Sequence, residues 1–347
     1  MLPGARLAPA ARFRIWQFVE PLRALGHAVE VRVLWPERYW APPTRVPLLR
    51  RMLGYGAGLL RLVSALWITR DVERFDIVFM NRDLVPEAGV TFLEPWLARR
   101  NPHLVFDVDD AIHLGSREKK LRKILPEFAL VAAGNEYLAD FARQVNARVE
   151  VWPTVVDTER FRPVDSRTPG PPRIGWSGSA STLQHCLPIL ERVMVELART
   201  ENFELLIVAD RAPDFAWPGV TMRYLPWSPE NEVESLQLFD IGLMPLKDDP
   251  FERGKCGAKA LTYMAIGIPA LVSPVGVNSG IVTPGNEGYH CRSDDEWLAA
   301  LRNLLHDPTL RAGMGHNAVA RVEAEYSLHS LVPRMVAAFT AVAGVRS

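Results

Sequence analysis

The chain carries, from Glu252 to Val277, the segment ERGKCGAKALTYMAIGIPALVSPVGV. Its apolar residues and glycines predict a helix over residues 257–267 and a buried strand over 270–272. Lys255 and Lys259 stand out because the chain has only six lysines against 34 arginines. A flexible cation at a helix N-terminus suits phosphate binding, since the macrodipole and the unpaired N–H groups also favour an anion. The alternative is a surface lysine on an amphipathic helix.

The same segment resembles the donor-binding segment of the retaining GT-B glycosyltransferases of family 4. Their usual pattern is Glu-x-Phe-Gly-x-x-x-x-Glu-x-x-Ala-x-Gly-x-Pro, and one branch of the family has Lys-x-x-Glu-Tyr-Met-Ala. The matching positions of this chain are Gly257, Lys259, Tyr263, Met264, Ala265, Gly267 and Pro269. The resemblance spans nearly the whole chain and implies an α/β fold of two Rossmann-like domains that face each other across a cleft.

Two positions depart from the family pattern. Gly254 and Thr262 stand where the family has its two glutamates, which hold hydroxyl groups of the donor sugar and of the ribose. The residues that the resemblance and the turn after the strand place at the donor site are Lys255, Gly257, Thr262, Tyr263, Gly276 and Asn278, with Lys259 as the catalytic cation.

The bulk composition sets limits on the class of protein. A length of 347 residues suits two domains of roughly 160–170 residues each. The net charge is zero, which gives no reason to expect a nucleic-acid partner. Cys186, Cys256 and Cys291 are odd in number and far apart, so we expect neither disulfides nor a zinc site, and a reducing cytoplasm fits best.

Strand-like runs alternate with helical patterns along the chain, which is typical of parallel sheets built from βα units. The predicted strands are 28–34, 77–80, 104–106, 130–133 and 149–152, then 173–176, 204–208, 221–224, 241–244 and 270–272. The predicted domains are 1–163 and 173–325, joined by a proline-rich linker over 164–172, with a last helix within 326–347 that packs back on the first domain. Because no apolar strand precedes the helix pattern of 13–25, we expect either that the N-terminal sheet lacks its first strand or that the true start of the chain lies upstream.

A second candidate for phosphate binding is the turn GWSGSAST over residues 175–182. It follows a predicted strand and opens a predicted helix over 182–199. Small residues let backbone N–H groups approach a diphosphate, and hydroxyl groups add donors. The alternative is a plain helix N-cap at Ser181. The candidate donor-binding residues here are Gly175, Ser177, Gly178 and Ser179, with Arg211, after the strand that ends at 208, placed to pack on the nucleotide.

Three carboxylates, Asp107, Asp109 and Asp110, follow the predicted strand 104–106. Ligands of open α/β sheets bind at this end of the strands. One interpretation is a DxD metal site, but the resemblance implies protein cations in place of a metal. Another is structural, with Asp110 capping a helix and Asp107 buried against an arginine. In the third, Asp109 or Asp110 orients an acceptor hydroxyl or stabilises positive charge at the sugar C1, with Arg82 and Asp107 on the acceptor side.

The most apolar window of the chain runs from Leu53 to Ile68. It is too short and too interrupted by glycines and Arg61 to span a bilayer. With its arginines it would lie on a membrane surface as an amphipathic helix. The alternative, which we favour from the sequence, is an ordinary helix packed on a sheet.

These patterns predict a retaining, metal-independent glycosyltransferase of polysaccharide biosynthesis type that uses no cofactor beyond its co-substrate. It would move a hexose from a nucleoside diphosphate sugar to a hydroxyl of a glycan, a lipid-linked glycan or a small molecule. We expect it in the cytoplasm or at the inner face of the membrane. The alternatives are a non-catalytic GT-B protein that binds a nucleotide or glycan within an assembly complex, and a nucleotide-sugar epimerase, for which no acid and base residues are assigned.

Overall fold

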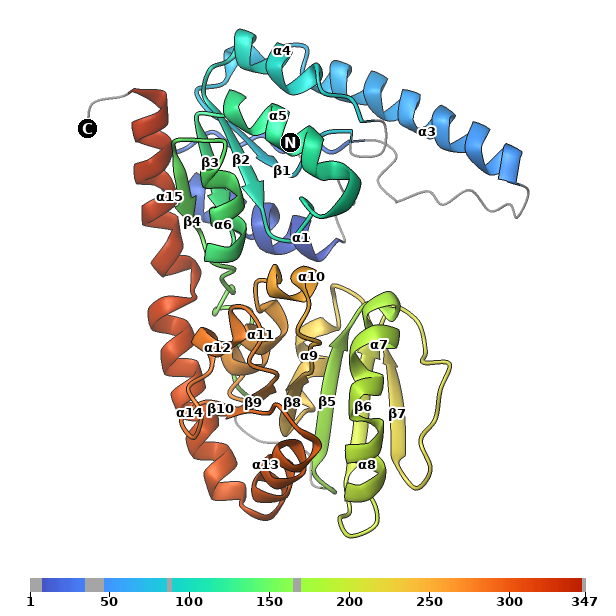
Figure 1. The fold of residues 1–347 in the computed structure, drawn as a ribbon. Helices are drawn as coiled ribbons and strands as arrows, with labels where there is room; N and C mark the ends of the chain where they lie inside the picture. The colour runs from blue at the N-terminus through green and yellow to red at the C-terminus, as the bar shows by residue number, and fades with distance from the viewer. Residues whose placement is uncertain (1–7, 35–46, 86–88, 165–169, 345–347) are drawn as a thin grey trace. The chain divides into compact units, whose positions relative to one another are not determined.

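The structure is a computed structural model that describes residues 8–34, 47–85, 89–164 and 170–344. It divides into two compact units (Figure 1). Unit 1 comprises Met1–Thr154 together with Leu331–Ser347, and unit 2 comprises Val155–Ser330. Most of the predicted linker, residues 165–169, lies outside the described residues.

Unit 1 is built on a parallel sheet of four strands in the order β1-β2-β3-β4. The strands are β1 Val78–Asn81, β2 Leu104–Val108, β3 Leu130–Ala133 and β4 Val149–Val151. All five residues of β2 are buried, Asp107 included, because helices cover both faces of a parallel sheet. The register places Asn81 opposite Asp107, so the polar ends of two neighbouring strands meet.

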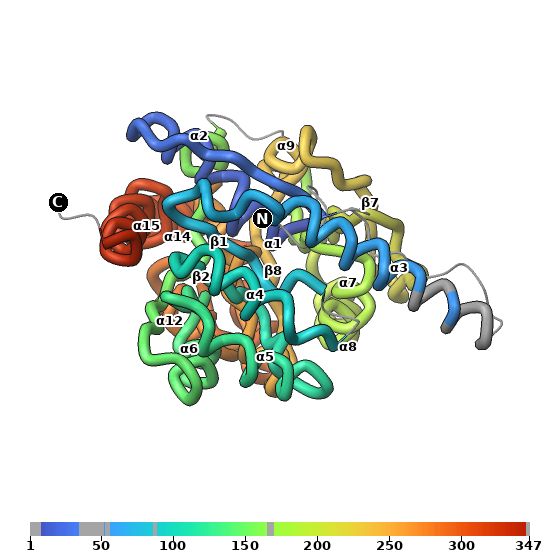
Figure 2. Tube along the Cα trace, turned by 90° about the horizontal axis from the view of Figure 1, so that it is seen from above, coloured from blue at the N-terminus to red at the C-terminus, as the bar shows by residue number. Residues whose placement is uncertain are grey.

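The helices of unit 1 include segments over the helix pattern of 13–25 and over the apolar window 53–68. They are α1 Pro9–Ala11, α2 Gln17–Ala24, α3 Pro47–Ile68, α4 Leu93–Arg100, α5 Glu118–Ile124 and α6 Glu136–Arg143. A π-helical turn, Arg12–Trp16, joins α1 to α2. Helix α3 has 22 residues, and its coloured part can be followed in Figure 2.

The predicted strand over 28–34 is wrong. Only Val33 makes an isolated bridge there, and the rest of the segment has no strand structure. Its apolar residues Val31 and Val33 pack on Ala11 and Ile15, while its polar residues make ion pairs, Arg32 with Asp71 at 2.5 Å among them. Side chains rather than a backbone ladder hold this segment. In the described residues no strand precedes β1.

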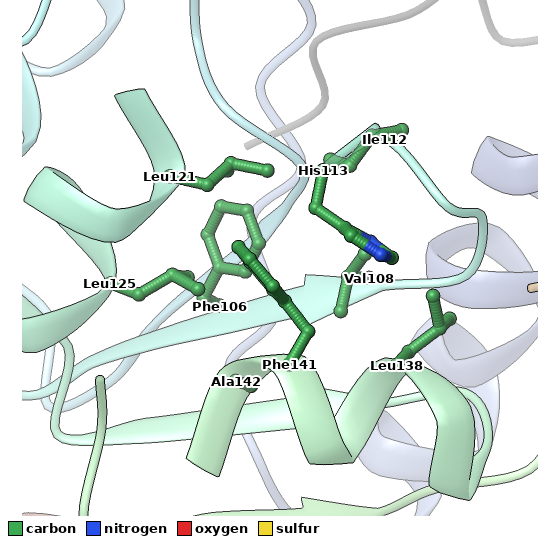
Figure 3. Close-up of a pocket in the computed structure, with 9 residues that line it drawn as sticks. All are labelled: Phe106, Val108, Ile112, His113, Leu121, Leu125, Leu138, Phe141 and Ala142. Carbon is green, nitrogen blue, oxygen red and sulfur yellow. The ribbon is translucent and has the colours of Figure 1, made fainter. Parts of the chain in front are cut away.

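A small cavity lies between β2 and the helices α5 and α6 (Figure 3). Its lining is Phe106, Val108, Ile112, His113, Leu121, Leu125, Leu138, Phe141 and Ala142. The volume is about 10 Å³, roughly the room that one water molecule needs. The imidazole of His113 stacks on Phe141 with ring centroids 4.4 Å apart. No predicted site residue lines this cavity, which is a packing gap too small for a substrate.

Unit 2 is built on a parallel sheet of six strands in the order β10-β9-β8-β5-β6-β7. The strands are β5 Arg173–Gly178, β6 Glu204–Ala209, β7 Thr221–Pro226, β8 Ile241–Met244, β9 Ala270–Val272 and β10 Gly288–His290. The chain proceeds outward from β5 to β7, then returns to the other side of β5 with β8. The order therefore reverses between β5 and β8, the point at which doubly wound sheets bind ligands.

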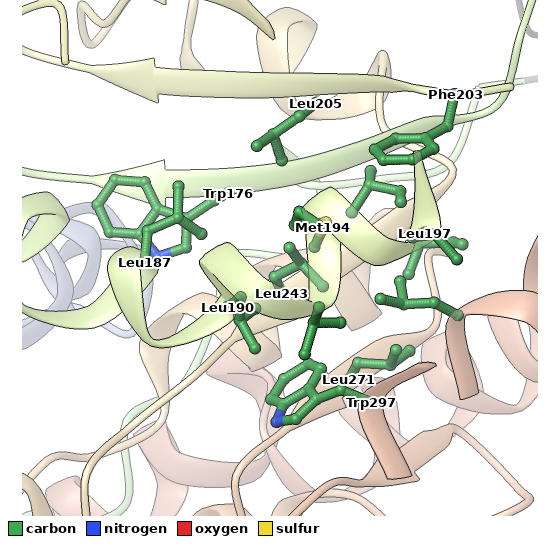
Figure 4. Packing of buried hydrophobic residues seen from close by; sticks show 14 of the residues in the cluster. Trp176, Leu187, Leu190, Met194, Leu197, Phe203, Leu205, Leu243, Leu271 and Trp297 are labelled. Atoms are coloured by element: carbon green, nitrogen blue, oxygen red, sulfur yellow. The ribbon is translucent and has the colours of Figure 1, made fainter. Parts of the chain in front are cut away.

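Helices accompany this sheet, and four of them contribute residues to one hydrophobic core (Figure 4). The helices are α7 Ala180–Cys186, α8 Glu191–Leu197, α9 Glu232–Gln237, α10 Pro250–Arg253, α11 Ala258–Ala265, α12 Asn278–Ile281, α13 Asp294–His306 and α14 Pro308–Glu325. The core includes Trp176, Leu187, Leu190, Met194, Leu197, Phe203, Leu205, Leu243, Leu271 and Trp297. The single helix predicted over 182–199 is broken into α7 and α8 by a 3₁₀ segment that contains Pro188, because proline cannot donate a helical hydrogen bond.

The last helix, α15 Leu328–Ala343, belongs to unit 1 from Leu331 onward. The ring of Phe339 contacts Phe79 and Trp152, with centroids 5.8 and 5.7 Å apart. Arg334 donates from Nη2 to the Val151 carbonyl at 2.9 Å. The final segment of the chain thus completes the core formed by the first.

Candidate active site

The turn after β5 is largely occupied by its own hydrogen bonds. Ser179, and not Ser181 as in the alternative from sequence, caps α7 by accepting from the Thr182 amide at 3.3 Å. The Ala180 amide donates to Asp210 Oδ1 at 2.6 Å. Asp210 follows β6, and no pattern in the sequence indicated that it would bind this amide. Two amides at the start of α7 therefore already have acceptors. Fewer backbone N–H donors are left for a phosphate than the sequence suggested.

The N-terminus of α11 has a different character. Its N-cap is Gly257, in the left-handed region at φ 72°, and no side chain caps the helix. A Cβ on Gly257 would lie 2.1 Å from Ile281 Cδ1, so both backbone and packing require glycine there. The first amides of α11 receive no side-chain cap, which is the arrangement that favours an anion.

Lys259 joins this helix terminus to the end of β5. Its Nζ lies 5.5 Å from the centroid of the buried Trp176 ring. Its Cε lies 2.9 Å from the place where a Cβ on Gly178 would stand. The absence of a side chain at Gly178 therefore gives the lysine its path across the strand end. The sequence predicted phosphate binding for both Lys259 and this turn, and the structure places Lys259 against Gly178.

Tyr263 ties the same helix to the same strand. Its hydroxyl accepts from the Ser177 amide at 2.9 Å, and its ring is fully buried. Burial raises the pKa of Tyr263 above its usual value, although the hydrogen bond from Ser177 acts in the opposite direction. The phenol therefore stays neutral and fixes α11 against β5, while the Ser177 amide is used within the protein.

Lys255 and Thr262 are each held by neighbours. Lys255 Nζ lies 3.8 Å from Glu252 Oε2 and 4.9 Å from the centroid of the Phe251 ring. Thr262 donates to the Lys259 carbonyl of its own helix at 2.9 Å and is buried. Its hydroxyl therefore replaces the family glutamate with a group that is turned to the backbone. Glu252, two positions before Gly254, is a nearby carboxylate that does not align with either glutamate of the family pattern and was not among the predicted site residues.

Three of the remaining donor-site candidates have clear packing roles. A Cβ on Gly175 would lie 2.0 Å from the Phe239 ring, so this glycine serves the core. Gly276, at φ 55°, lets its loop approach Arg253, whose carbonyl oxygen would be 2.6 Å from a Cβ. Asn278 is buried and donates to the Ser273 carbonyl at 3.1 Å. Arg211 is exposed after β6, where the sequence placed it.

In unit 1, Arg82 brings two of the predicted acidic residues together. Its guanidinium donates to Asp109 Oδ1 and to Asp110 Oδ2, each at 2.7 Å. Burial acts to lower the pKa of Arg82, but the two carboxylates outweigh it and raise this pKa. The backbone of Arg82 has φ 65°, which is strained for any residue other than glycine. Such strained residues are often found at functional sites.

Asp107 is placed differently from its two neighbours. It is fully buried, and Arg14 binds its carboxylate from Nε at 3.1 Å to both oxygens. Asn81 donates to Oδ2 at 2.7 Å. Arg14 also donates from Nη1 to the Trp152 carbonyl at 2.8 Å. A carboxylate enclosed in this way supports the strand end and does not contact an acceptor, in agreement with the structural interpretation of Asp107.

Two further findings concern the residues that the structure describes. Among them, no group of three or more histidine, cysteine, aspartate or glutamate side chains is arranged to hold a metal ion. Within the same ranges, no helix has both the length and the apolar character needed to cross a membrane.

Part of the chain matches a known protein family. Residues 171–307 match the family model described as Glycosyl transferases group 1. This range contains β5 to β10 and every donor-site candidate named above. No curated protein matches the chain significantly.

The solved structures that resemble the chain include three with broad coverage. Sucrose-phosphate synthase from Thermosynechococcus elongatus has a TM-score of 0.68 at 17% identity, over 92% of this chain and 85% of that one. Alr3699/HepE from Anabaena, in complex with UDP and glucose, has 0.63 at 14%, over 92% and 88%. A glycosyltransferase from Rickettsia africae ESF-5 has 0.63 at 11%, over 95% and 89%. At these identities the likeness shows the fold, that of the GT-B glycosyltransferases. The family match and the fold together indicate a glycosyltransferase enzyme.

Proposed function

We propose that this glycosyltransferase, whose second unit carries a group 1 domain, is a retaining and metal-independent hexosyltransferase. Its donor is a nucleoside diphosphate sugar, and its acceptor is a hydroxyl of a glycan, a lipid-linked glycan or a small molecule. UDP-sugars are the first donors to test, because Alr3699/HepE, which shares this fold, was solved with UDP and with UDP-glucose. Three buried free cysteines suit a reducing cytoplasm.

The position of Lys259 is the observation that carries this proposal. It lies at an uncapped helix N-terminus, against Gly178, and at the point where the strand order reverses. The ammonium and the first amides of α11 together favour a diphosphate. Lys255 stands four residues earlier, on the loop that leads into the same helix, as a second cation.

In the reaction, the bond between the sugar C1 and the diphosphate oxygen breaks, and a bond from C1 to the acceptor oxygen forms on the same face. The acceptor proton passes to the departing phosphate oxygen. Lys259 neutralises the negative charge that develops on that phosphate, an interaction that is stronger in the transition state than in the ground state. Asp109 and Asp110, which Arg82 orients, would stabilise the positive charge that develops at C1 or position the acceptor hydroxyl.

Nucleotide binding by the full chain tests the donor site. We expect UDP to bind in calorimetry with EDTA present, and Lys259→Met to bind it at least about tenfold more weakly, since a charge-assisted contact contributes about 1.5–3 kcal/mol. The matched control is Lys123→Met, which removes an exposed lysine of α5 in unit 1. Equal affinity in Lys259→Met and wild type, with both proteins folded, would refute the phosphate assignment.

Turnover separates a transferase from a protein that only binds nucleotide. Incubation with UDP-glucose and EDTA should release UDP, and the first-formed sugar should have the donor's anomeric configuration by NMR. Inversion of that configuration would refute retention. Loss of turnover in EDTA that magnesium restores would refute metal independence. Tight UDP binding without any turnover, across donors and acceptors, would instead favour the non-catalytic reading, to which the replaced glutamates at Gly254 and Thr262 point.

A further inference from the structure

Helix α3 of unit 1 exposes an unusual number of large apolar side chains on one face. Met52 is 63% exposed, Leu59 62%, Val63 56% and Trp67 64%, and Leu60 and Leu66 are also exposed. At 3.6 residues per turn, these positions fall within roughly one third of the helix circumference. Leu59 to Trp67 form a row about 12 Å long at 1.5 Å per residue, and Met52 lies about two turns further toward the helix N-terminus. We call these six residues the α3 apolar row.

The opposite face of α3 is packed into unit 1. Ala57, Arg61, Ala65 and Ile68 are buried. The helix therefore has one face fixed in a folded unit and the other turned to solvent, so it would lie along a surface. A surface helix of a globular protein normally points its apolar side inward and its polar side outward. In α3 both sides are largely apolar, which marks the outer one as an interaction surface.

Charge around the α3 apolar row indicates what would cover it. Between residues 47 and 70 the chain has no aspartate or glutamate. Arginines stand at both ends of the row, Arg50 and Arg51 before it and Arg70 after it. The guanidinium of Arg70 lies 4.3 Å from the centroid of the Trp67 ring. Apolar side chains flanked by arginines and an amphipathic tryptophan suit an anionic lipid surface.

We propose that the α3 apolar row docks unit 1 on an anionic lipid bilayer, with α3 parallel to the membrane plane. The apolar side chains enter the boundary between headgroups and acyl chains, and Arg70 meets lipid phosphates. A second copy of the chain fits less well, because an isologous contact between two such helices would bring arginines together without a carboxylate to pair them. Membrane docking by α3 involves no residue of the donor site, so it can be tested independently of sugar transfer.

Vesicle sedimentation with the full chain tests this docking. We expect binding to vesicles of phosphatidylcholine and phosphatidylglycerol, and binding about tenfold or more weaker to phosphatidylcholine alone. The variant Leu59→Ser with Val63→Ser should lose about tenfold or more in partitioning, since it removes apolar area from the centre of the row. The matched control is Leu25→Ser, which changes a side chain of unit 1 that is 58% exposed but lies outside α3, and it should partition as wild type does.

Several outcomes would overturn the proposal. One is no sedimentation with anionic vesicles. Another is equal partitioning of the double variant and wild type, with both folded by circular dichroism. A third is a concentration-dependent dimer in solution that the double variant abolishes, because the row would then be covered by a second copy. If the double variant does not fold, Arg70→Gln replaces it as the test. This substitution should weaken binding to anionic vesicles and leave binding to phosphatidylcholine vesicles unchanged.

Discussion

Substitution of Gly178 by alanine tests the contact between β5 and α11 directly. The added Cβ would lie 2.6 Å from Trp176 Cη2, 2.9 Å from Trp176 Cζ2 and 2.9 Å from Lys259 Cε. All three distances are shorter than carbon atoms tolerate, so something must move. The lysine end is flexible, whereas the Trp176 ring is buried in the core of unit 2. We therefore expect Lys259 to be displaced from the strand end and the Trp176 ring to be strained.

Two magnitudes follow for Gly178→Ala. Overpacking of a core side chain costs about 1–3 kcal/mol, and each kcal/mol lowers the melting temperature by about 2–4 °C at this size. We expect a melting temperature about 2–12 °C lower by circular dichroism. UDP affinity by calorimetry should fall about tenfold or more, since displacement of Lys259 removes a charge-assisted contact with the diphosphate.

The control is Gly313→Ala in α14, where an added Cβ meets nothing within 4 Å. Alanine is the better helix former, so this variant should keep or raise the melting temperature. It should also bind UDP as wild type does. Wild-type stability and wild-type affinity in Gly178→Ala would show that Trp176 and Lys259 do not lie against Gly178, and the argument for the phosphate site would fail with them.

Three further changes probe other parts of the chain. Arg14→Met should cost about 3–5 kcal/mol in urea unfolding, because it leaves the carboxylate of Asp107 buried without its cation; a loss below about 1 kcal/mol would contradict this pairing. Tyr263→Phe should cost about 1–3 kcal/mol in the same assay, since the buried Ser177 amide loses its acceptor, and an unchanged midpoint would refute that bond. Burial lowers the pKa of His113 below its usual 6.5, so the unfolded chain binds the proton more readily and folding stability falls as the pH drops through 6.5. Melting temperatures of His113→Gln should vary less between neutral and mildly acidic pH than those of wild type, and identical pH profiles would exclude this contribution.

The sequence predicted much of the fold because local patterns were strong. The run that contains Asp107 is apolar and short and has polar residues at its end, and it forms β2 as expected. The glycine and lysine pattern of α11 likewise predicted that helix and its N-terminus. Such features depend on residues close in sequence, which periodicity and helix-end signals report.

What the sequence did not predict depends on contacts between distant residues. One interpretation of the sequence buried Asp107 against an arginine, but no spacing indicates which arginine, and the structure shows that it is Arg14, 93 positions away. The same holds for Asp210, which accepts from the Ala180 amide 30 positions away. Both interactions decide which polar groups are used within the protein. The structure therefore favours the N-terminus of α11 over the turn after β5 as the phosphate-binding site.

The return of α15 to unit 1 has a consequence for how the protein is made. Unit 1 consists of the first 154 residues and a segment that starts at Leu331. Domains fold as they leave the ribosome, so all of unit 2 is synthesised before Phe339 can reach the rings of Phe79 and Trp152. Unit 1 thus begins to fold before unit 2 but completes its aromatic core only after α15 has been synthesised, and until then that core stays open to chaperones and proteases.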